Sequence, residues 1–240
     1  MTHIAHPYVQ RLGINRDWRS RWYTTDPKKY REYIRTDYNI RKLLQKKLKG
    51  MSIDAIEIER DQKALRILIK TARPGLVIGR SGEGATQLKK DVDMLLRKLK
   101  LSDKPEIKID IEEVRSVESS AAIVAQMIVE GLEKRMQFRR VMKQTVEKAM
   151  ANRDVQGVRI IASGRLGGAD MARREELKKG RIPLQTLRAD IDFARERANL
   201  PYGVIGVKVW IYRGDVFGDR KANEAPEKQP ARRRPNTRNS

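Results

Sequence analysis

The sequence predicts an α+β protein of two domains, and three observations point to this class. The chain has 240 residues, which is enough for two hydrophobic cores, and 39% of them are hydrophobic. Its first part shows the order helix, strand, strand, helix, helix, strand. Its second part shows two helices followed by four strands, an order typical of helices packed on one face of a sheet.

The first domain is expected over residues 39–113. Its predicted elements are a helix at 39–49, strands at 53–60 and 65–71, a short apolar run at 76–78, a helix ending near 99, and a strand around 107–111. The first helix has Ile40, Leu43, Leu44 and Leu48 on one face, and the strands alternate isoleucine or leucine with charged residues. This alternation predicts a half-buried sheet.

The second domain is expected over residues 114–214, with both helices packed on one face of a four-stranded sheet. Its predicted elements are helices at 117–133 and 134–151 and four strands: 155–163, around 171–177 with 181–183 as its hairpin return over 179–180, 187–197 and 204–213. Residues 1–38 are expected to form a basic and aromatic arm and helix. Residues 215–240, rich in Pro, Arg and Asn, are expected to be a disordered basic tail.

Positive charge is the dominant compositional feature. Lys and Arg number 53 against 31 acidic residues, a formal net charge of +22. Such an excess is costly for a lone protein but suits a polyanionic partner, because neutralised phosphates release condensed counterions. The charge is spread along the chain rather than concentrated on one amphipathic helix, so nucleic acid is favoured over a membrane surface.

Several other classes of protein are disfavoured. Cysteine is absent, which excludes disulfides and thiolate metal sites. No apolar run is long enough for a membrane span and no signal pattern opens the chain, so a cytoplasmic protein without membrane contact is expected. His3 and His6 are the only histidines and lack nearby acidic partners, so no catalytic residue, metal or cofactor is predicted.

The most informative motif is the loop Gly79, Arg80, Ser81 and Gly82. Two glycines three residues apart let a nucleic-acid backbone approach closely, and the following helix favours phosphate with its N-terminal amides. An ordinary helix–helix turn is the alternative. The αββααβ order around the loop resembles a type II KH domain, whose G-x-x-G loop clamps nucleotides. Neither a P-loop nor a dinucleotide fingerprint fits the glycine spacing.

Other basic groups are weaker candidates. Arg139, Arg140 and Lys143 form a basic stripe on a predicted helix, with Arg135 one turn earlier; a merely solvated helix face is the alternative. Arginines interleave with aromatic residues in the arm, where base stacking competes with simple packing; they include Arg16, Arg19, Arg21, Trp18, Trp22, Tyr30 and Tyr33. The glycine-rich loop 163–168 around Arg165 could approach a phosphate backbone or be only a flexible hairpin connection. Asp190 and Asp192 could hold a metal, but surface salt bridges with nearby Arg188 and Arg195 explain them more simply.

Two sets of segments resemble bacterial small-subunit ribosomal protein three. Segments 39–42, 56–60 and 77–79 resemble its KH half; Ser-Gly-Arg-Leu-Gly-Gly-Ala at 163–169 and segments 180–192 and 202–211 resemble its C-terminal half. The resemblance covers roughly residues 11–214. It departs at residues 1–10, which differ from the usual family arm, and at 173–177, which lack the expected aromatic residues.

The resemblance implies a non-catalytic component of the small-subunit head that binds ribosomal RNA. It implies that Arg139, Arg140 and Lys143 line the channel through which messenger RNA enters and help to unwind it. Arg11, Arg16, Arg19, Arg21, Trp22, Arg165 and Arg188 become candidate contacts with ribosomal RNA. The implied neighbours are ribosomal proteins ten and fourteen of the head and proteins four and five at the channel. A free-standing KH regulator and a nuclease or lyase are the competing hypotheses.

Overall fold

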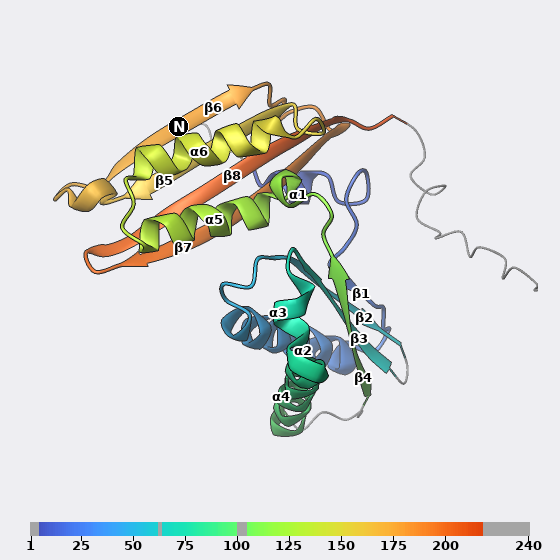
Figure 1. Ribbon diagram of the computed structural model, residues 1–240. Helices are drawn as coiled ribbons and strands as arrows, with labels where there is room; N and C mark the ends of the chain where they lie inside the picture. Colours follow the sequence, from blue (N-terminus) through green and yellow to red (C-terminus); the bar gives the residue numbers. More distant parts are fainter. Residues whose placement is uncertain (1–4, 62–63, 100–104, 218–240) are drawn as a thin grey trace, which may run out of the picture.

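The computed structural model describes residues 5–61, 64–99 and 105–217, and it contains two α+β units (Figure 1). The first unit has helices on one face of a four-stranded sheet in the order β1-β2-β3-β4. The second has two helices on one face of a four-stranded sheet in the order β6-β5-β8-β7. The predicted fold class is therefore confirmed, whereas the predicted tail from residue 218 onward lies outside the described residues.

The first unit contains the predicted αββααβ order. Its elements are α2 (Pro27–Lys47), β2 (Ile53–Arg60), β3 (Ala64–Thr71), α3 (Pro74–Ile78), α4 (Glu83–Leu99) and β4 (Glu106–Glu113). Strand β2 pairs antiparallel with β3, and β4 pairs parallel with β3. The short β1 (Ser20–Arg21), supplied by the arm, adds a parallel edge to β2. Isoleucines and leucines from the sheet, α2 and α4 form one buried core.

Helix α2 begins twelve residues before the predicted start. The Asp26 carboxylate accepts a hydrogen bond from the Lys28 amide, and Pro27 occupies the first turn, so both start signals lie upstream of residue 39. The predicted boundary between residues 38 and 39 consequently falls inside one continuous helix.

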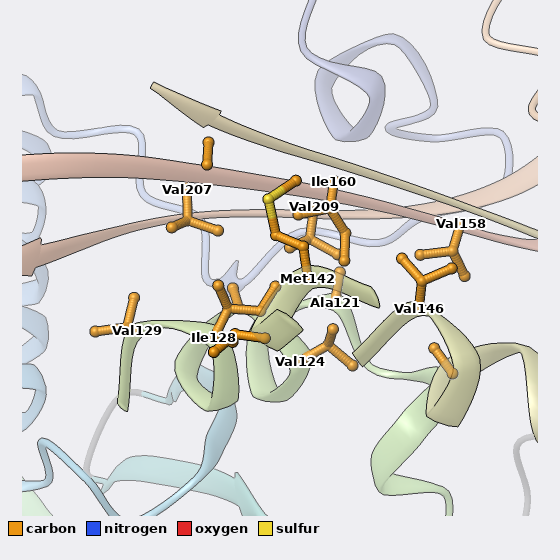
Figure 2. Packing of buried hydrophobic residues seen from close by; sticks show 14 of the residues in the cluster. Ala121, Val124, Ile128, Val129, Met142, Val146, Val158, Ile160, Val207 and Val209 are labelled. Carbon is orange, nitrogen blue, oxygen red and sulfur yellow. The ribbon is translucent and has the colours of Figure 1, made fainter. Parts of the chain in front are cut away.

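The second unit is built on four antiparallel strands. Its elements are α5 (Ala121–Glu133), α6 (Phe138–Ala151), β5 (Gly157–Gly164), β6 (Arg173–Gly180), β7 (Ala189–Leu200) and β8 (Gly203–Asp215). In Figure 2, side chains from α5, including Val124 and Ile128, point towards Met142 of α6 and towards Ile160 and Val209 of the sheet. This contact buries the predicted apolar face of both helices against the sheet.

Two local predictions for this unit are wrong. Residues 117–119 form a 3₁₀ turn, and α6 starts at Phe138 because Arg135, with a φ of 58°, breaks the helix before it. Arg135 therefore does not lie on the basic helix stripe.

The predicted return strand at 181–183 is also absent. Strand β6 pairs with β5 instead, and residues 181–188 cross to β7 as an irregular segment. At the end of this pair, a Cβ on Gly157 would lie 2.0 Å from the Arg181 carbonyl oxygen. Glycine at that position lets the chain leave the sheet where a hairpin partner was expected.

The arm covers the second face of this sheet. Helix α1 (Pro7–Gln10) packs against β7, and His6 makes an edge contact with Phe193. A second, smaller apolar cluster around Ile191 and Trp210 lies on this face. Both faces of the sheet are thus covered, one by helices and the other by the arm and the crossing segment.

Polar contacts join the two units. The Gln126 side chain of α5 accepts from the Ile53 amide (3.1 Å) and donates to the Ile53 carbonyl (2.8 Å), which extends the edge of β2. Ser120 donates to Asp54 from the start of α5. Across the described ranges, no helix has the length and apolar character needed to span a membrane.

Candidate nucleic-acid interface

The Gly79–Gly82 loop forms a tight exposed turn between α3 and α4. Gly79 adopts φ 73° and ψ −177°, a region open almost only to glycine, and Gly82 has a φ of 80°. Ser81 also has a positive φ, and both Arg80 and Ser81 are exposed. The loop therefore presents its backbone and one cationic side chain to solvent, as a phosphate contact requires.

A third glycine, Gly84, determines how closely α3 and α4 approach. A Cβ at this position would lie 2.5 Å from the Val77 carbonyl oxygen and 2.9 Å from that of Ile78. Gly84 thus allows the first turn of α4 to contact the end of α3, which holds the loop in its tight form. Glycine spacing in the sequence did not indicate this role, because it depends on the close approach of α3 and α4.

The first turns of α6 carry the basic stripe. Arg139, Arg140 and Lys143 are all exposed, while Val141 and Met142 on the same helix are buried in the core. The first turn contains no acidic residue and no side-chain cap, so its free amides add to the positive potential. In the described part of the chain, neither Arg140 nor Lys143 has an acidic partner within salt-bridge distance.

Arg139 differs from its neighbours because it is held by β6. Its Nε and one terminal nitrogen lie 3.1 and 3.0 Å from the two carboxylate oxygens of Glu175. Arg173 approaches the same carboxylate at 3.3 Å, and both guanidinium groups lie over the Phe138 ring, at 5.6 and 5.7 Å from its centre. Sequence reasoning missed Arg173 and Glu175, whose positions on β6 bring them to α6 only in the folded sheet.

Arg11 and Arg16, both predicted RNA contacts, are engaged by partners inside the protein. Arg11 has no exposed surface and donates hydrogen bonds to four carbonyl oxygens, those of Pro7, Leu184, Thr186 and Ala189. Arg16 is four-fifths buried and lies 2.8 Å from the Asp190 carboxylate. Both residues fasten the arm to the second unit.

Asp190 and Asp192 are buried rather than exposed. Arg16 contacts both carboxylates and Arg213 contacts Asp192, whereas the predicted partner Arg188 pairs with Asp215. Burial alone would raise the pKa of Asp192, but Arg213 and Arg16 lower it on balance. The two carboxylates therefore belong to an internal ion network.

The other arm candidates divide into paired and open side chains. Arg21 is surrounded by carboxylates of Asp17, Glu57 and Glu59. The Trp22 indole donates to Asp37 and packs edge-on against tyrosines of α2, so it serves helix packing. Trp18 and Arg19, by contrast, are exposed.

Arg165 and Arg188 are also engaged within the chain. Arg165 turns back to donate to the carbonyl oxygens of Ala169 and Tyr202, which stabilises the glycine-rich loop. Arg188 pairs with Asp215 at 2.9 Å, yet its side chain is 61% exposed. Arg188 can therefore still reach a partner, whereas the guanidinium of Arg165 is largely committed to its loop.

The fold and the exposed cations define a two-domain RNA-binding protein with a type II KH unit. Family models agree with this class: a KH domain model matches residues 39–119, and the model of the ribosomal protein S3 C-terminal domain matches residues 128–211. Relatives named small ribosomal subunit protein uS3 are similar over almost their whole length. The one from Caldicellulosiruptor bescii is 46% identical over 91% of this chain and 95% of its own.

Two further relatives of the same name extend the comparison. The protein from Desulfatibacillum aliphaticivorans is 49% identical over 89% of this chain and 93% of its own. The protein from Shewanella amazonensis is 44% identical over 96% of this chain and 97% of its own. The chain belongs to the uS3 family of small-subunit ribosomal proteins.

Family membership decides between the hypotheses drawn from the sequence. The chain is a structural, non-enzymatic component of the small ribosomal subunit in the cytoplasm, with ribosomal RNA and ribosomal proteins as its partners. The nuclease and free-standing regulator hypotheses are therefore set aside.

Proposed function

We propose that the exposed α6 stripe contacts messenger RNA where it enters the small subunit and helps to hold and unwind it. Arg140 and Lys143 are the main contact residues, and Arg139 joins them. The observation that carries this proposal is the exposure of Arg140 and Lys143 without an acidic partner among the described residues. Cations without an internal partner are free to neutralise phosphates on a passing strand.

The remaining exposed cations are proposed to contact ribosomal RNA. The KH loop offers Arg80 and the backbone at Gly79 and Gly82, while Arg19 and Arg188 are exposed elsewhere. Arg11 is excluded from this set by its complete burial, and Arg16 and Arg165 are engaged internally. Ribosomal proteins ten and fourteen in the head, and four and five beside the messenger channel, are the proposed protein neighbours.

The test of the messenger contact uses small subunits that carry the double variant R140A/K143A. Passage through a duplex placed downstream in the messenger should slow, because fewer cations hold the separated strand. For the isolated chain, affinity for single-stranded RNA should also depend less on salt. The slope of log affinity against log salt should become shallower by roughly 1.4, because two phosphate contacts are lost.

The variant R80A, in the KH loop, is a control that removes a positive charge away from α6. It should leave duplex passage unchanged if the loop meets ribosomal RNA instead. Unchanged passage with R140A/K143A, in subunits that contain the variant at full occupancy, would disprove the messenger contact.

A further inference from the structure

The cluster that joins α6 to β6 has an arrangement that the α6 stripe alone does not explain. Glu175 lies under two arginines: its side chain is 25% exposed, whereas those of Arg139 and Arg173 are 68% and 50% exposed. Both guanidinium groups face solvent across the Phe138 ring. The acid is thus largely covered while its cationic partners remain accessible.

We propose that Arg173 is a further RNA-binding residue of the α6 surface, and that Glu175 is an internal competitor for the RNA phosphate. This inference rests on the proposed function of α6. In the free protein the Glu175 carboxylate occupies the planar donor face of Arg139. A phosphate group offers the same paired oxygens and replaces the carboxylate on both arginines when RNA binds.

The energetics of the pair favour exchange over a purely structural role. Exposed ion pairs stabilise folded proteins little, because water and salt screen them. The hydrogen bond from Arg139 lowers the pKa of Glu175, so the carboxylate is ionised at neutral pH and competes as an anion. An RNA phosphate can therefore replace Glu175 on two arginines that are already positioned, with little loss of folding free energy.

The position of β6 extends the binding surface beyond the helix. Strand β6 is one of the two edge strands of its sheet and runs beside α6 (Figure 1). Arg173 is at the end of β6 that contacts the first turn of α6, next to Arg139. An RNA strand that is bound by Arg140 and Lys143 can therefore continue across Phe138 and contact Arg173.

The test measures the affinity of the full chain for an unstructured single-stranded RNA over a salt series. The variant E175Q keeps the size of the side chain but removes its charge, so binding should tighten roughly two- to fivefold. The variant R173A should weaken binding. It should also make the slope of log affinity against log salt shallower by roughly 0.7, the value expected for one lost phosphate contact.

Glu176 provides a matched control on the same strand. Its side chain points to the opposite face of β6, where it pairs with Arg159 and Arg174. The variant E176Q changes net charge equally and should alter affinity far less than E175Q. Equal effects of both variants would show a general charge effect and overturn the inference.

The outcomes also separate this inference from the proposed function. If R140A/K143A weakens RNA binding but E175Q and R173A leave it unchanged, the α6 contact stands and the role of the cluster is refuted. If E175Q weakens binding and lowers the urea midpoint, the pair is an anchor of β6 and the competitor role is wrong. If R140A/K143A has no effect while R173A does, the α6 proposal fails by itself.

Discussion

Arg11 carries a full positive charge at a position with no exposed surface. Its guanidinium donates to the carbonyl oxygens of Leu184 and Thr186, in the segment that crosses from β6 to β7, and to that of Ala189 at the start of β7. An irregular segment cannot satisfy its own carbonyls in a ladder, and one arginine fork satisfies several of them. Arg11, which the sequence predicts as an RNA contact, thus stabilises the packing of the arm against the second unit.

The variant R11M tests this role. It keeps the apolar stem but removes the donors, so the buried carbonyls lose their partners and stability should fall by about 2–3 kcal/mol. Urea denaturation measures the loss, and R31A on the exposed face of α2 is the control with little expected change. Full stability combined with weaker RNA binding would instead restore the RNA contact.

At the scale of elements, the helix–loop–helix of the KH unit depends on close backbone approach. Alanine usually stabilises a helix relative to glycine, by about 1 kcal/mol. At Gly84 the added Cβ would meet the Val77 carbonyl oxygen at 2.5 Å, so α3 and α4 would have to separate. The tertiary contact therefore reverses the effect expected from helix propensity.

The variant G84A should consequently destabilise the α3–α4 pair by about 1–3 kcal/mol, as overpacking generally does. Faster hydrogen exchange of the α4 amides is the measurement. G75A is the control, since a Cβ on Gly75 of α3 meets nothing within 4 Å. Equal protection in G84A and wild type would show that the helices adjust without cost.

At the scale of the whole molecule, the contact between the units contains the half-buried Asp54, and the buried Asp192 lies close to it. Burial and the nearby Asp192 raise the pKa of Asp54, which accepts a hydrogen bond from Ser120. Arg213 and Arg16 outweigh burial and lower the pKa of Asp192. Two neighbouring carboxylates near the contact between the units thus have pKa values that are shifted in opposite directions.

These shifts predict a stability that rises and then falls as the solution is acidified. Asp54 has a folded pKa above its unfolded value, so its ionisation costs stability at pH 7, and protonation removes this cost on acidification. Asp192 has a depressed folded pKa, so its contribution is present above the unfolded value and is lost at lower pH. Urea midpoints between pH 7 and pH 3 measure both effects.

The variant D54N separates the two groups. It should raise the urea midpoint at pH 7, since the asparagine oxygen can still accept from Ser120. It should also reduce the increase on mild acidification, to which Glu196 contributes because burial raises its pKa as well. If the urea midpoint of the wild type falls continuously as the pH is lowered from 7 to 3, the raised pKa of Asp54 is contradicted.

The amino-acid sequence by itself determined the element order, the two cores, the KH loop and the polyanionic partner. These properties follow from local periodicity, glycine spacing and net charge, which do not depend on distant contacts. The start of α2 was missed although Asp26 and Pro27 signalled it, because the apolar face of its first turns faces other parts of the arm rather than the KH core.

Only the tertiary structure decided which cations are free. Arg11 and Arg140 have the same side chain, yet one is enclosed by carbonyls of residues more than 170 positions away and the other faces solvent. The pairing of Arg139 and Arg173 with Glu175 likewise joins a helix to a strand more than 30 positions later. The residue type fixes which charge a side chain can carry, whereas the partner of that charge and the shift of its pKa are set by long-range packing.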